Sequence, residues 1–267
     1  MNRIGILDPS QPINLEHPLN RGLVSWWKVI PQFRSINPFR DLAHRNNIDL
    51  TSGTPTSTRR SHLGGWGSLD VSGVQMEAAG ASKDIINSSL TMAGWVRFTS
   101  HSGYGGCFGF RNDSNCDFFI LSLSSSVNME CRFRGSTGSY FDVIATNVVN
   151  AWTHMIMTHD MAHGLESRLT VYVDGVAAGS VSTGGAGSIA ITSASETFDL
   201  AHTNGMQMTG QLDDIRLYNR AFSSADAMQL YLESRVKHSR LLNYIEPAEF
   251  NAAGHVSPYY YHHLLAG

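Results

Sequence analysis

With 267 residues, the chain is long enough for two ordinary domains or for one large β domain with appended segments. Its formal net charge is −3, from 19 Lys and Arg against 22 Asp and Glu, which provides no basic surface for a row of phosphates and argues against nucleic acid as a partner. Charged residues are only 15% of the chain while glycine occupies 25 positions, a composition that favours β structure with many turns.

The first 21 residues are expected to form an extended N-terminal arm. Pro9, Pro12 and Pro18 each remove an amide donor and disfavour helix in the residue before them. The basic start is followed only by the short apolar run Ile4–Leu7, which is too short for a signal peptide. No later run approaches the roughly 20 apolar residues of a membrane-spanning helix. We therefore expect synthesis in the cytoplasm without export, and no membrane partner.

Residues 22–235 are expected to form one all-β domain, because short runs of β-branched and aromatic residues alternate there with Gly, Ser, Asn and Asp. Asp174-Gly175 predicts a type I′ hairpin turn, which needs positive φ at both central residues. The segments 91–98 and 152–158 carry apolar residues on both faces, as strands in a two-sheet packing do. The tryptophans lie mostly in such stretches and are expected in the core.

A glycine-rich stretch at residues 101–115 mixes aromatic, amide and arginine side chains. Sugar sites use this combination, because rings stack on the apolar faces of sugars while polar groups bind the hydroxyls. The candidate glycan-binding residues are Tyr104, Arg111, Asn112, Asp113 and Asn115. The alternative is that residues 112–115 are a plain hairpin turn and that the aromatic residues of the stretch fill the core.

The spacing of cysteines and histidines argues against a shared metal site. Cys107, Cys116 and Cys131 form neither a CxxC pair nor the local Cys and His spacing of a zinc site, so we expect reduced, mostly buried thiols. His154 and His159 lie five residues apart in an expected strand, which places them on opposite faces.

The segment 212–218 is expected to be a strand, in which simple alternation puts Asp213 on the face of Ile215 and puts Asp214 and Arg216 on the other face. A buried carboxylate needs hydrogen bonds or a metal. Asp213 is therefore expected to accept loop amides or, as a weak candidate metal ligand, to help hold calcium. Asp214 and Arg216 are expected to be an exposed pair worth less than about 1 kcal/mol.

The C-terminal part begins with Ser223–Asp226, which resembles a capping box with Asp in the usual Glu position, and predicts a short helix through Leu232. From residue 236 to residue 267 the strand pattern ends and we expect a docking tail. Three adjacent tyrosines cannot all face one small core, so the candidate partner-docking residues are Tyr259, Tyr260, Tyr261, Leu264 and Leu265.

Four segments together resemble the laminin G-like, concanavalin A-like jelly-roll superfamily: Leu90–Val96, Trp152–Met155, Leu169–Gly175 and Gly210–Ser223. The resemblance covers roughly residues 22–231. It implies a two-sheet antiparallel jelly-roll sandwich with a short C-terminal helix, leaving the N- and C-terminal arms outside. The chain is also similar to laminin G-like proteins encoded by tailed bacteriophages. The fold alone does not specify an activity.

An enzymatic role is not expected. Glucanases of this superfamily commonly place their carboxyls on one strand as Glu-x-Asp-x-x-Glu, and glycoside hydrolysis needs two carboxyls that flank the scissile bond. The nearest match here, Glu196 and Asp199, has an odd spacing that points the two side chains to opposite faces of a strand.

The function is therefore expected to lie in the surfaces and the tails. Our first hypothesis is a virion structural protein, such as a surface decoration, head or tail component of a bacteriophage, made in the host cytoplasm and docked through its arms on capsid or tail proteins and on copies of itself. The alternative is a carbohydrate-binding, lectin-like adhesion module that recognises a cell-surface glycan. No cofactor is expected beyond a possible structural calcium.

Overall fold

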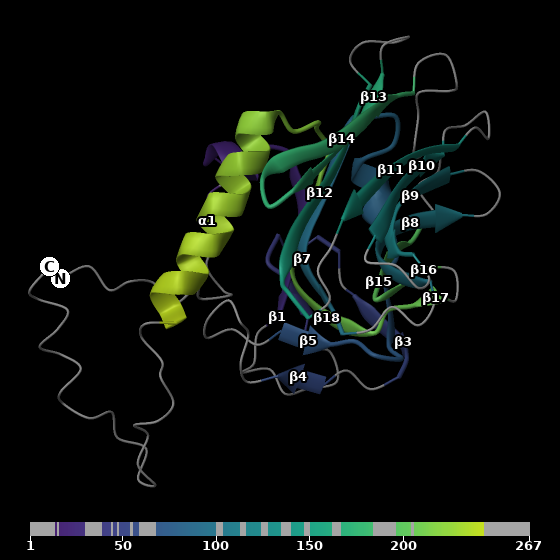
Figure 1. Ribbon diagram of the computed structural model, residues 1–267, viewed down its shortest axis with the longest axis vertical. Coiled ribbons are helices and arrows are strands. Elements are labelled where there is room, and N and C mark those ends of the chain that lie inside the picture. Colours follow the sequence, from purple (N-terminus) through teal and green to yellow (C-terminus); the bar gives the residue numbers. More distant parts are fainter. Residues whose placement is uncertain are drawn as a thin grey trace, which may run out of the picture.

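The computed structural model describes residue 14 and residues 16–29, 39–43, 45–46, 48–53, 56–58, 68–99, 104–112, 116–123, 128–134, 140–146, 150–161, 167–183, 196–203 and 206–242. These residues form two facing sheets, almost entirely antiparallel, with one long helix against the outside of the first sheet (Figure 1). The all-β jelly-roll prediction is confirmed. Within this described part of the chain, no helix is long and apolar enough to cross a membrane.

The first sheet, sheet A, has a main path of seven strands. In spatial order they are β14 (Val176–Ser182), β13 (Arg168–Val173), β12 (Thr153–Asp160), β7 (Leu90–Phe98), β18 (Gly210–Tyr218), β1 (Leu23–Val29) and β2 (Phe39–Asp41). Two short strands extend it from β18, namely β5 (Ser68–Asp70) and β4 (Thr56–Thr58). Both strands predicted around residues 91–98 and 152–158 are confirmed, and they pair with each other.

The second sheet, sheet B, faces sheet A across the core. Its main path is β11 (Tyr140–Thr146), β10 (Asn128–Arg134), β9 (Cys116–Ser122), β8 (Gly105–Asn112), β15 (Phe198–Leu200), β6 (Gln75–Ala78) and β3 (Asp49–Ser52). Two short strands, β16 (His202–Thr203) and β17 (Met206–Gln207), pair with each other, and β17 also pairs with β8. The remaining described elements are two 3₁₀ helices, η1 (Pro18–Asn20) and η2 (Ala81–Asp84), and the helix α1 (Ser224–Leu242).

The core lies between the sheets and follows the alternation of each strand. Trp27 of sheet A stacks on Phe198 of sheet B with ring centroids 4.8 Å apart. Asp174 and Gly175 have φ of 50° and 80°, so the predicted turn between β13 and β14 is confirmed. Of the five tryptophans, Trp26, Trp27 and Trp95 are buried. The prediction of buried core tryptophans is confirmed for these three: Trp27 lies between the sheets, whereas Trp26 and Trp95 are buried on the outer face of sheet A.

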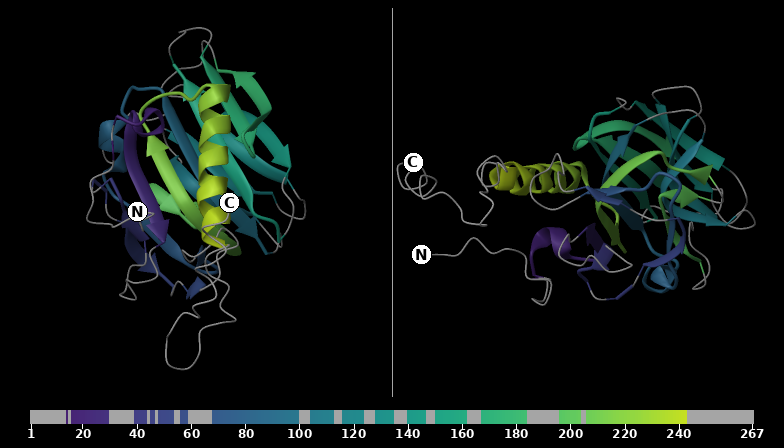
Figure 2. Two further views of the ribbon diagram at one scale, coloured as in Figure 1. Left: turned by 90° about the vertical axis from the view of Figure 1, so that its left-hand side faces the viewer. Right: turned by 90° about the horizontal axis from the view of Figure 1, so that it is seen from below.

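Helix α1 covers that outer face (Figure 2). Its capping box is confirmed: the Ser223 hydroxyl donates to the Asp226 carboxylate at 2.7 Å, and the Asp226 amide donates back to the Ser223 hydroxyl at 3.2 Å. The Trp95 indole N–H donates to the Ser234 hydroxyl at 3.2 Å. The helix continues past the predicted end at Leu232 to Leu242. On the same side, η1 buries Leu19, so the last residues of the predicted N-terminal arm pack on the domain.

The predicted orientation of Asp213 is wrong because β18 contains a bulge. Asp213 pairs with Trp95 and Arg216 pairs with Ala93, so β18 has one extra residue between these pairs. Asp214 adopts a φ of 55° within the bulge. The extra residue shifts the alternation, and Asp213 therefore lies on the face of Trp95 and α1, opposite to the face that Ile215 contributes to the core.

The prediction of an exposed Asp214–Arg216 pair is also wrong. Both residues are buried, and the Arg216 guanidinium donates to the Asp214 carboxylate at 2.9 and 3.0 Å. The Trp26 indole N–H donates to the same carboxylate, and the Lys28 ammonium lies 3.9 Å away. The guanidinium also stacks on the Trp26 ring at 4.1 Å. Asp214, Arg216, Trp26 and Lys28 therefore form a buried ionic cluster on the outer face of sheet A.

The described cysteines and histidines agree with the sequence analysis. Cys107 and Cys131 are free, fully buried thiols, and burial raises the pKa of both; the side chain of Cys116 lies outside the described part. His154 and His159 do lie on opposite faces, since His154 contacts the Tyr231 ring of α1 while His159 stacks on Phe133 between the sheets.

Candidate functional site: a pocket on the outer face of sheet B

The two faces of sheet B are separated by the alternation of its strands. In β9, Phe118 and Ile120 belong to the core, so Phe119 and Leu121 face outward. In β10 the outward residues include Glu130 and Arg132, between core residues. Helix α1 lies on the far side of the sandwich (Figure 1). The outer face of sheet B therefore carries its own mixture of aromatic, aliphatic and charged side chains.

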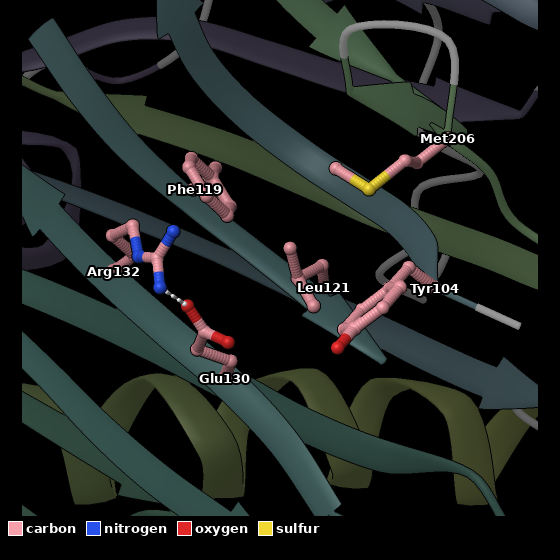
Figure 3. A pocket seen from close by; sticks show the side chains of 6 residues that line it. All are labelled: Tyr104, Phe119, Leu121, Glu130, Arg132 and Met206. Atoms are coloured by element: carbon pink, nitrogen blue, oxygen red, sulfur yellow. Dashed lines mark ion pairs between the residues drawn. The ribbon is translucent and has the colours of Figure 1, made fainter. Parts of the chain in front are cut away.

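A pocket of about 220 Å³ opens on this face. Figure 3 shows its lining side chains, which come from the start of β8, from β9 and β10, and from β17: Tyr104, Phe119, Leu121, Glu130, Arg132 and Met206. Phe119 and Leu121 are almost fully buried in the pocket floor, whereas Tyr104 is 56% exposed at its side. The pocket thus combines an apolar floor, one accessible aromatic ring and one charged wall.

Gly109 of β8 permits the floor to form. It pairs with Phe119 across the strands and has a φ of 141°. A Cβ at this position would lie 2.4 Å from the Phe118 carbonyl oxygen and from the Phe119 Cα, which is closer than heavy atoms can approach. Only glycine therefore lets β9 lie this close to β8 at the pocket.

The charged wall is centred on Arg132. Its guanidinium lies 2.5 Å from a carboxylate oxygen of Glu130 and donates to Asp142 of β11 at 2.9 and 3.3 Å. The same guanidinium lies 5.9 Å from the centroid of the Phe119 ring. The side chains of Arg132 and Asp142 are 28% and 33% exposed, so a ligand can reach their polar atoms. Two carboxylates and one guanidinium give this group a net negative charge.

This arrangement offers two kinds of contact to a small ligand. The Tyr104 ring can stack on an apolar face of a sugar ring, and its hydroxyl remains available for hydrogen bonding. The carboxylates accept hydrogen bonds from hydroxyls while Arg132 can donate them. A largely apolar pocket with a few convergent polar groups is the usual form of a small-ligand site.

Of the predicted glycan-binding residues, only Tyr104 has a described side chain, and it lines the pocket. Arg111 and Asn112 lie in β8, but their side chains are outside the described part. Asp113 and Asn115 lie outside it entirely. Residues 113–115 connect β8 to β9 at the pair Asn112–Cys116, as the hairpin alternative required. Phe108 and Phe110 fill the core as that alternative required, whereas Tyr104, the third aromatic residue of the stretch, is exposed, so sugar binding by this stretch stays a prediction.

The sequence analysis missed most of the pocket. Phe119, Leu121, Glu130 and Arg132 lie in strands that the stretch 101–115 does not include. Alternation in β10 was the available signal, since the charged residues Glu130 and Arg132 alternate with apolar ones. The five predicted docking residues, Tyr259, Tyr260, Tyr261, Leu264 and Leu265, lie outside the described residues.

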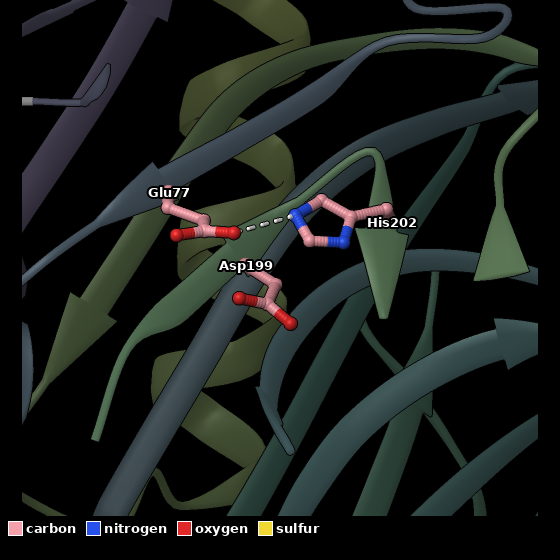
Figure 4. A group of neighbouring side chains, drawn as sticks. All are labelled: Glu77, Asp199 and His202. Carbon is pink, nitrogen blue, oxygen red and sulfur yellow. Dashed lines mark ion pairs between the residues drawn. The ribbon is translucent and has the colours of Figure 1, made fainter. Parts of the chain in front are cut away.

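One group of possible metal ligands lies on the same face, formed by Glu77, Asp199 and His202 (Figure 4). The other candidate ligand, Asp213, lies on the opposite side of the molecule, fully buried on the outer face of sheet A. Its role in calcium binding stays a prediction. Glu196, the other carboxyl weighed as a catalytic group, is buried just before β15.

A family profile described as the concanavalin A-like lectin/glucanases superfamily matches residues 72–227. No curated protein matches the chain. Among solved structures, the binding domain of Paraclostridial Mosquitocidal Protein 1 has a TM-score of 0.62 and 16% identity, and the match covers 80% of this chain and 52% of that one.

Binding domains of botulinum neurotoxins are similar to the same extent. The binding domain of botulinum neurotoxin DC in complex with SialylT has a TM-score of 0.61 and 10% identity, over 81% of this chain and 52% of that one. The serotype G binding domain has a TM-score of 0.61 and 10% identity, over 79% and 51%. This chain therefore spans about half the length of these structures, and the likeness establishes a shared fold.

Proposed function

Because the chain belongs to the concanavalin A-like lectin/glucanase superfamily, we propose that it is a non-enzymatic, lectin-like binding module whose pocket on sheet B binds a carbohydrate. The observation that carries the proposal is the pairing of an exposed Tyr104 ring with the charged wall of Glu130, Arg132 and Asp142 around an apolar floor. A sugar ring presents both apolar C–H faces and polar hydroxyls, so it matches both parts of this surface.

The size of the pocket limits the ligand. About 220 Å³ is below the roughly 300–1,000 Å³ of pockets that enclose drug-sized molecules. The pocket accordingly fits one sugar ring, with the rest of a glycan lying outside it. Weak binding by a single site is expected, and several copies displayed together would strengthen it through multivalency.

The relatives give independent support. The similar solved structures are binding domains of toxins, and one of them is a complex with SialylT. These are proteins that attach to a target, in line with a binding role for the present chain. Their low identity and half-length coverage leave the identity of the sugar to experiment.

The test is a glycan-array screen of the full chain, followed by saturation-transfer NMR on the best saccharide with wild type and Tyr104→Ala. We expect binding in the millimolar range or tighter, with at least about a tenfold loss in the variant, because stacking of a nucleic-acid base on one aromatic side chain is worth on the order of 1–3 kcal/mol and sugar stacking is expected to be of the same order. Ile144→Ala is the matched control, since Ile144 is 49% exposed on the neighbouring strand β11 but does not line the pocket.

Two results would contradict the proposal: absence of any saccharide binding at millimolar concentrations, or wild-type binding by Tyr104→Ala. Because Tyr104 is exposed, its loss is not expected to unfold the chain. A thermal melt of the variant alongside wild type checks this directly.

Assembly on a virus particle is a second proposal, and it concerns the C-terminal side of the molecule. Figures 1 and 2 show that α1 diverges from sheet A, so the C-terminal end of the helix lies away from the sandwich. This geometry suits a tail that docks on capsid or tail proteins, or on another copy. Deletion of residues 243–267 is then expected to abolish incorporation into particles while sugar binding persists; full incorporation of the truncated chain would refute it.

A further inference from the structure

Three metal-binding side chains converge on the outer face of sheet B, beside the proposed sugar pocket. Glu77 of β6 and Asp199 of β15 are directly opposed across the two strands, and His202 follows on β16. One ligand atom from each residue lies within 4.8 Å of the ligand atoms of the other two. Figure 4 shows the imidazole directed at the Glu77 carboxylate, with Asp199 next to both.

The backbone fixes the place of His202. Ala201 has a φ of 64°, which turns the chain between β15 and β16. The Ala201 amide donates to the Cys107 carbonyl at 2.7 Å, and the Ala201 carbonyl accepts from the Met208 amide at 2.8 Å. Ala201 is fully buried, so neighbouring strands hold this turn on both sides. The imidazole is thereby brought to the face that carries Asp199, before any ligand binds.

The chemistry of the three groups suits a cation. Two carboxylates directly opposite each other on neighbouring strands repel, and a positive ion between them removes that cost. His202 is only 5% exposed, and its burial lowers the pKa of the imidazole below 6.5 although Glu77 acts to raise it. A buried imidazole whose ring lies among two carboxylates is placed to offer a nitrogen lone pair to a metal.

We propose that Glu77, Asp199 and His202 form a binding site for a divalent transition-metal cation, with Zn²⁺ as the best match. Zinc accepts imidazole nitrogen together with carboxylate oxygen, whereas calcium is bound almost entirely by oxygen. Zinc–ligand distances of roughly 2.0–2.2 Å require donors about 3–3.6 Å apart, which small side-chain rotations from the observed spacing provide. Water can complete the coordination, since Glu77 is partly exposed.

The site is independent of the proposed sugar binding. Gly109 pairs with Asp199 on one side and with Phe119 of the pocket floor on the other, so site and pocket are neighbours on one sheet. No residue is shared between them. Failure of the sugar proposal would leave this one standing, and the reverse also holds.

The experiment is isothermal titration of the full chain, treated with a chelator and dialysed, with ZnCl₂. We expect the wild-type chain to bind one equivalent of zinc saturably. In Asp199→Asn and His202→Gln this binding should be lost or at least about tenfold weaker. Loss of only a residue that supports a metal ligand already lowers metal affinity by roughly 10–100-fold. Glu77→Gln provides a third variant at a partly exposed position, where the fold is least perturbed. Thermal melts confirm that each variant is folded.

Two controls separate this site from other zinc-binding groups. Asp142→Asn removes a carboxylate from the same sheet face but outside the cluster, and His262→Ala with His263→Ala removes the adjacent histidines near the C-terminus. Both are expected to bind zinc as wild type does. Co²⁺ substitution adds a spectroscopic test, because an imidazole-bound cobalt ion gives visible absorption that changes in His202→Gln.

The proposal is overturned if the chain shows no saturable zinc binding with a dissociation constant below about 1 mM, which corresponds to a binding free energy of about 4 kcal/mol. It is equally overturned if all three cluster variants bind zinc like wild type, or if the histidine control abolishes binding. Binding of calcium in preference to zinc would refute the assignment to a transition metal.

Discussion

The outer faces of the two sheets are built from the same alternating strand pattern, but their polar and aromatic side chains differ in solvent exposure. On sheet A, η1 packs beside Trp26 and helix α1 packs on Trp95, and the Asp214–Arg216 pair on the same face is buried as well. On sheet B, Arg132 and Asp142 remain partly exposed and Tyr104 is open to solvent. The same types of residue therefore support stability where they are buried on sheet A and are available to a ligand at the pocket on sheet B, where Tyr104 and, in part, Arg132 stay exposed above a buried floor.

The largest effect on stability is expected on the outer face of sheet A, where the ion pair is buried. Asp214→Ala removes the carboxylate that accepts from Arg216 and Trp26, and leaves buried cationic groups without it. We expect a loss of about 3–5 kcal/mol in the free energy of unfolding, measured by urea denaturation.

The matched change on sheet B is Asp142→Asn. It removes the negative charge of the carboxylate that accepts from Arg132, in a partly exposed pair. A loss of less than about 1 kcal/mol is expected there. Similar losses from Asp214→Ala and Asp142→Asn would show that the covering of sheet A does not set the energetic difference between the faces.

An effect smaller than that of Asp214→Ala is expected in the core that both sheets share. His159 is fully buried against Phe133, its Nε2 lies 3.1 Å from the Thr183 hydroxyl, and burial lowers its pKa to about 4 although Asp160 acts to raise it. The unfolded chain therefore takes up a proton on this histidine at higher pH than the folded chain does. Its contribution to stability is complete above about pH 7 and is lost as the pH falls from about 6.5 to 4, by about 3 kcal/mol.

Urea denaturation at a series of pH values, for wild type and His159→Gln, measures this contribution. Glutamine does not titrate, so the difference in unfolding free energy between the two proteins should change over that pH range and level off below about pH 4. A difference that stays constant from pH 7 to pH 4 would contradict the prediction.

A smaller effect than that of His159 is expected when the start of helix α1 is weakened. Ser223→Ala removes the capping hydroxyl that bonds Asp226, and a lost cap costs about 1 kcal/mol. Because the first turns of α1 cover sheet A, hydrogen exchange should quicken in α1 and in the Trp95 region, and should be unchanged in β9 and β10 of sheet B. Equal quickening in both sheets would mean that the two faces are not stabilised separately.

Local patterns were sufficient wherever a feature depends on neighbouring residues. The turn at Asp174-Gly175 and the capping box at Ser223 need only a few adjacent residues, and both were predicted correctly. The strand at 152–158 was predicted correctly from its apolar pattern. The length of α1 was underestimated, since its helix propensity continues past Leu232 without an apolar pattern to indicate it.

Features that depend on pairing between distant strands were not accessible in this way. The bulge at Asp214 becomes visible only when β18 is aligned with β7, and it reverses the predicted face of Asp213. One extra residue moves every earlier side chain to the other face, because the strand period is two.

The sequence by itself determined the secondary-structure elements and the class of fold, since turn chemistry, capping and alternation are encoded within short segments. The tertiary structure decided which residues of each outer face stay exposed, and it brought Glu77 next to Asp199 and His202, and Tyr104 and Arg132 into one pocket. Those neighbours arise from strand register and from the position of α1, which are set by packing between segments far apart in the chain.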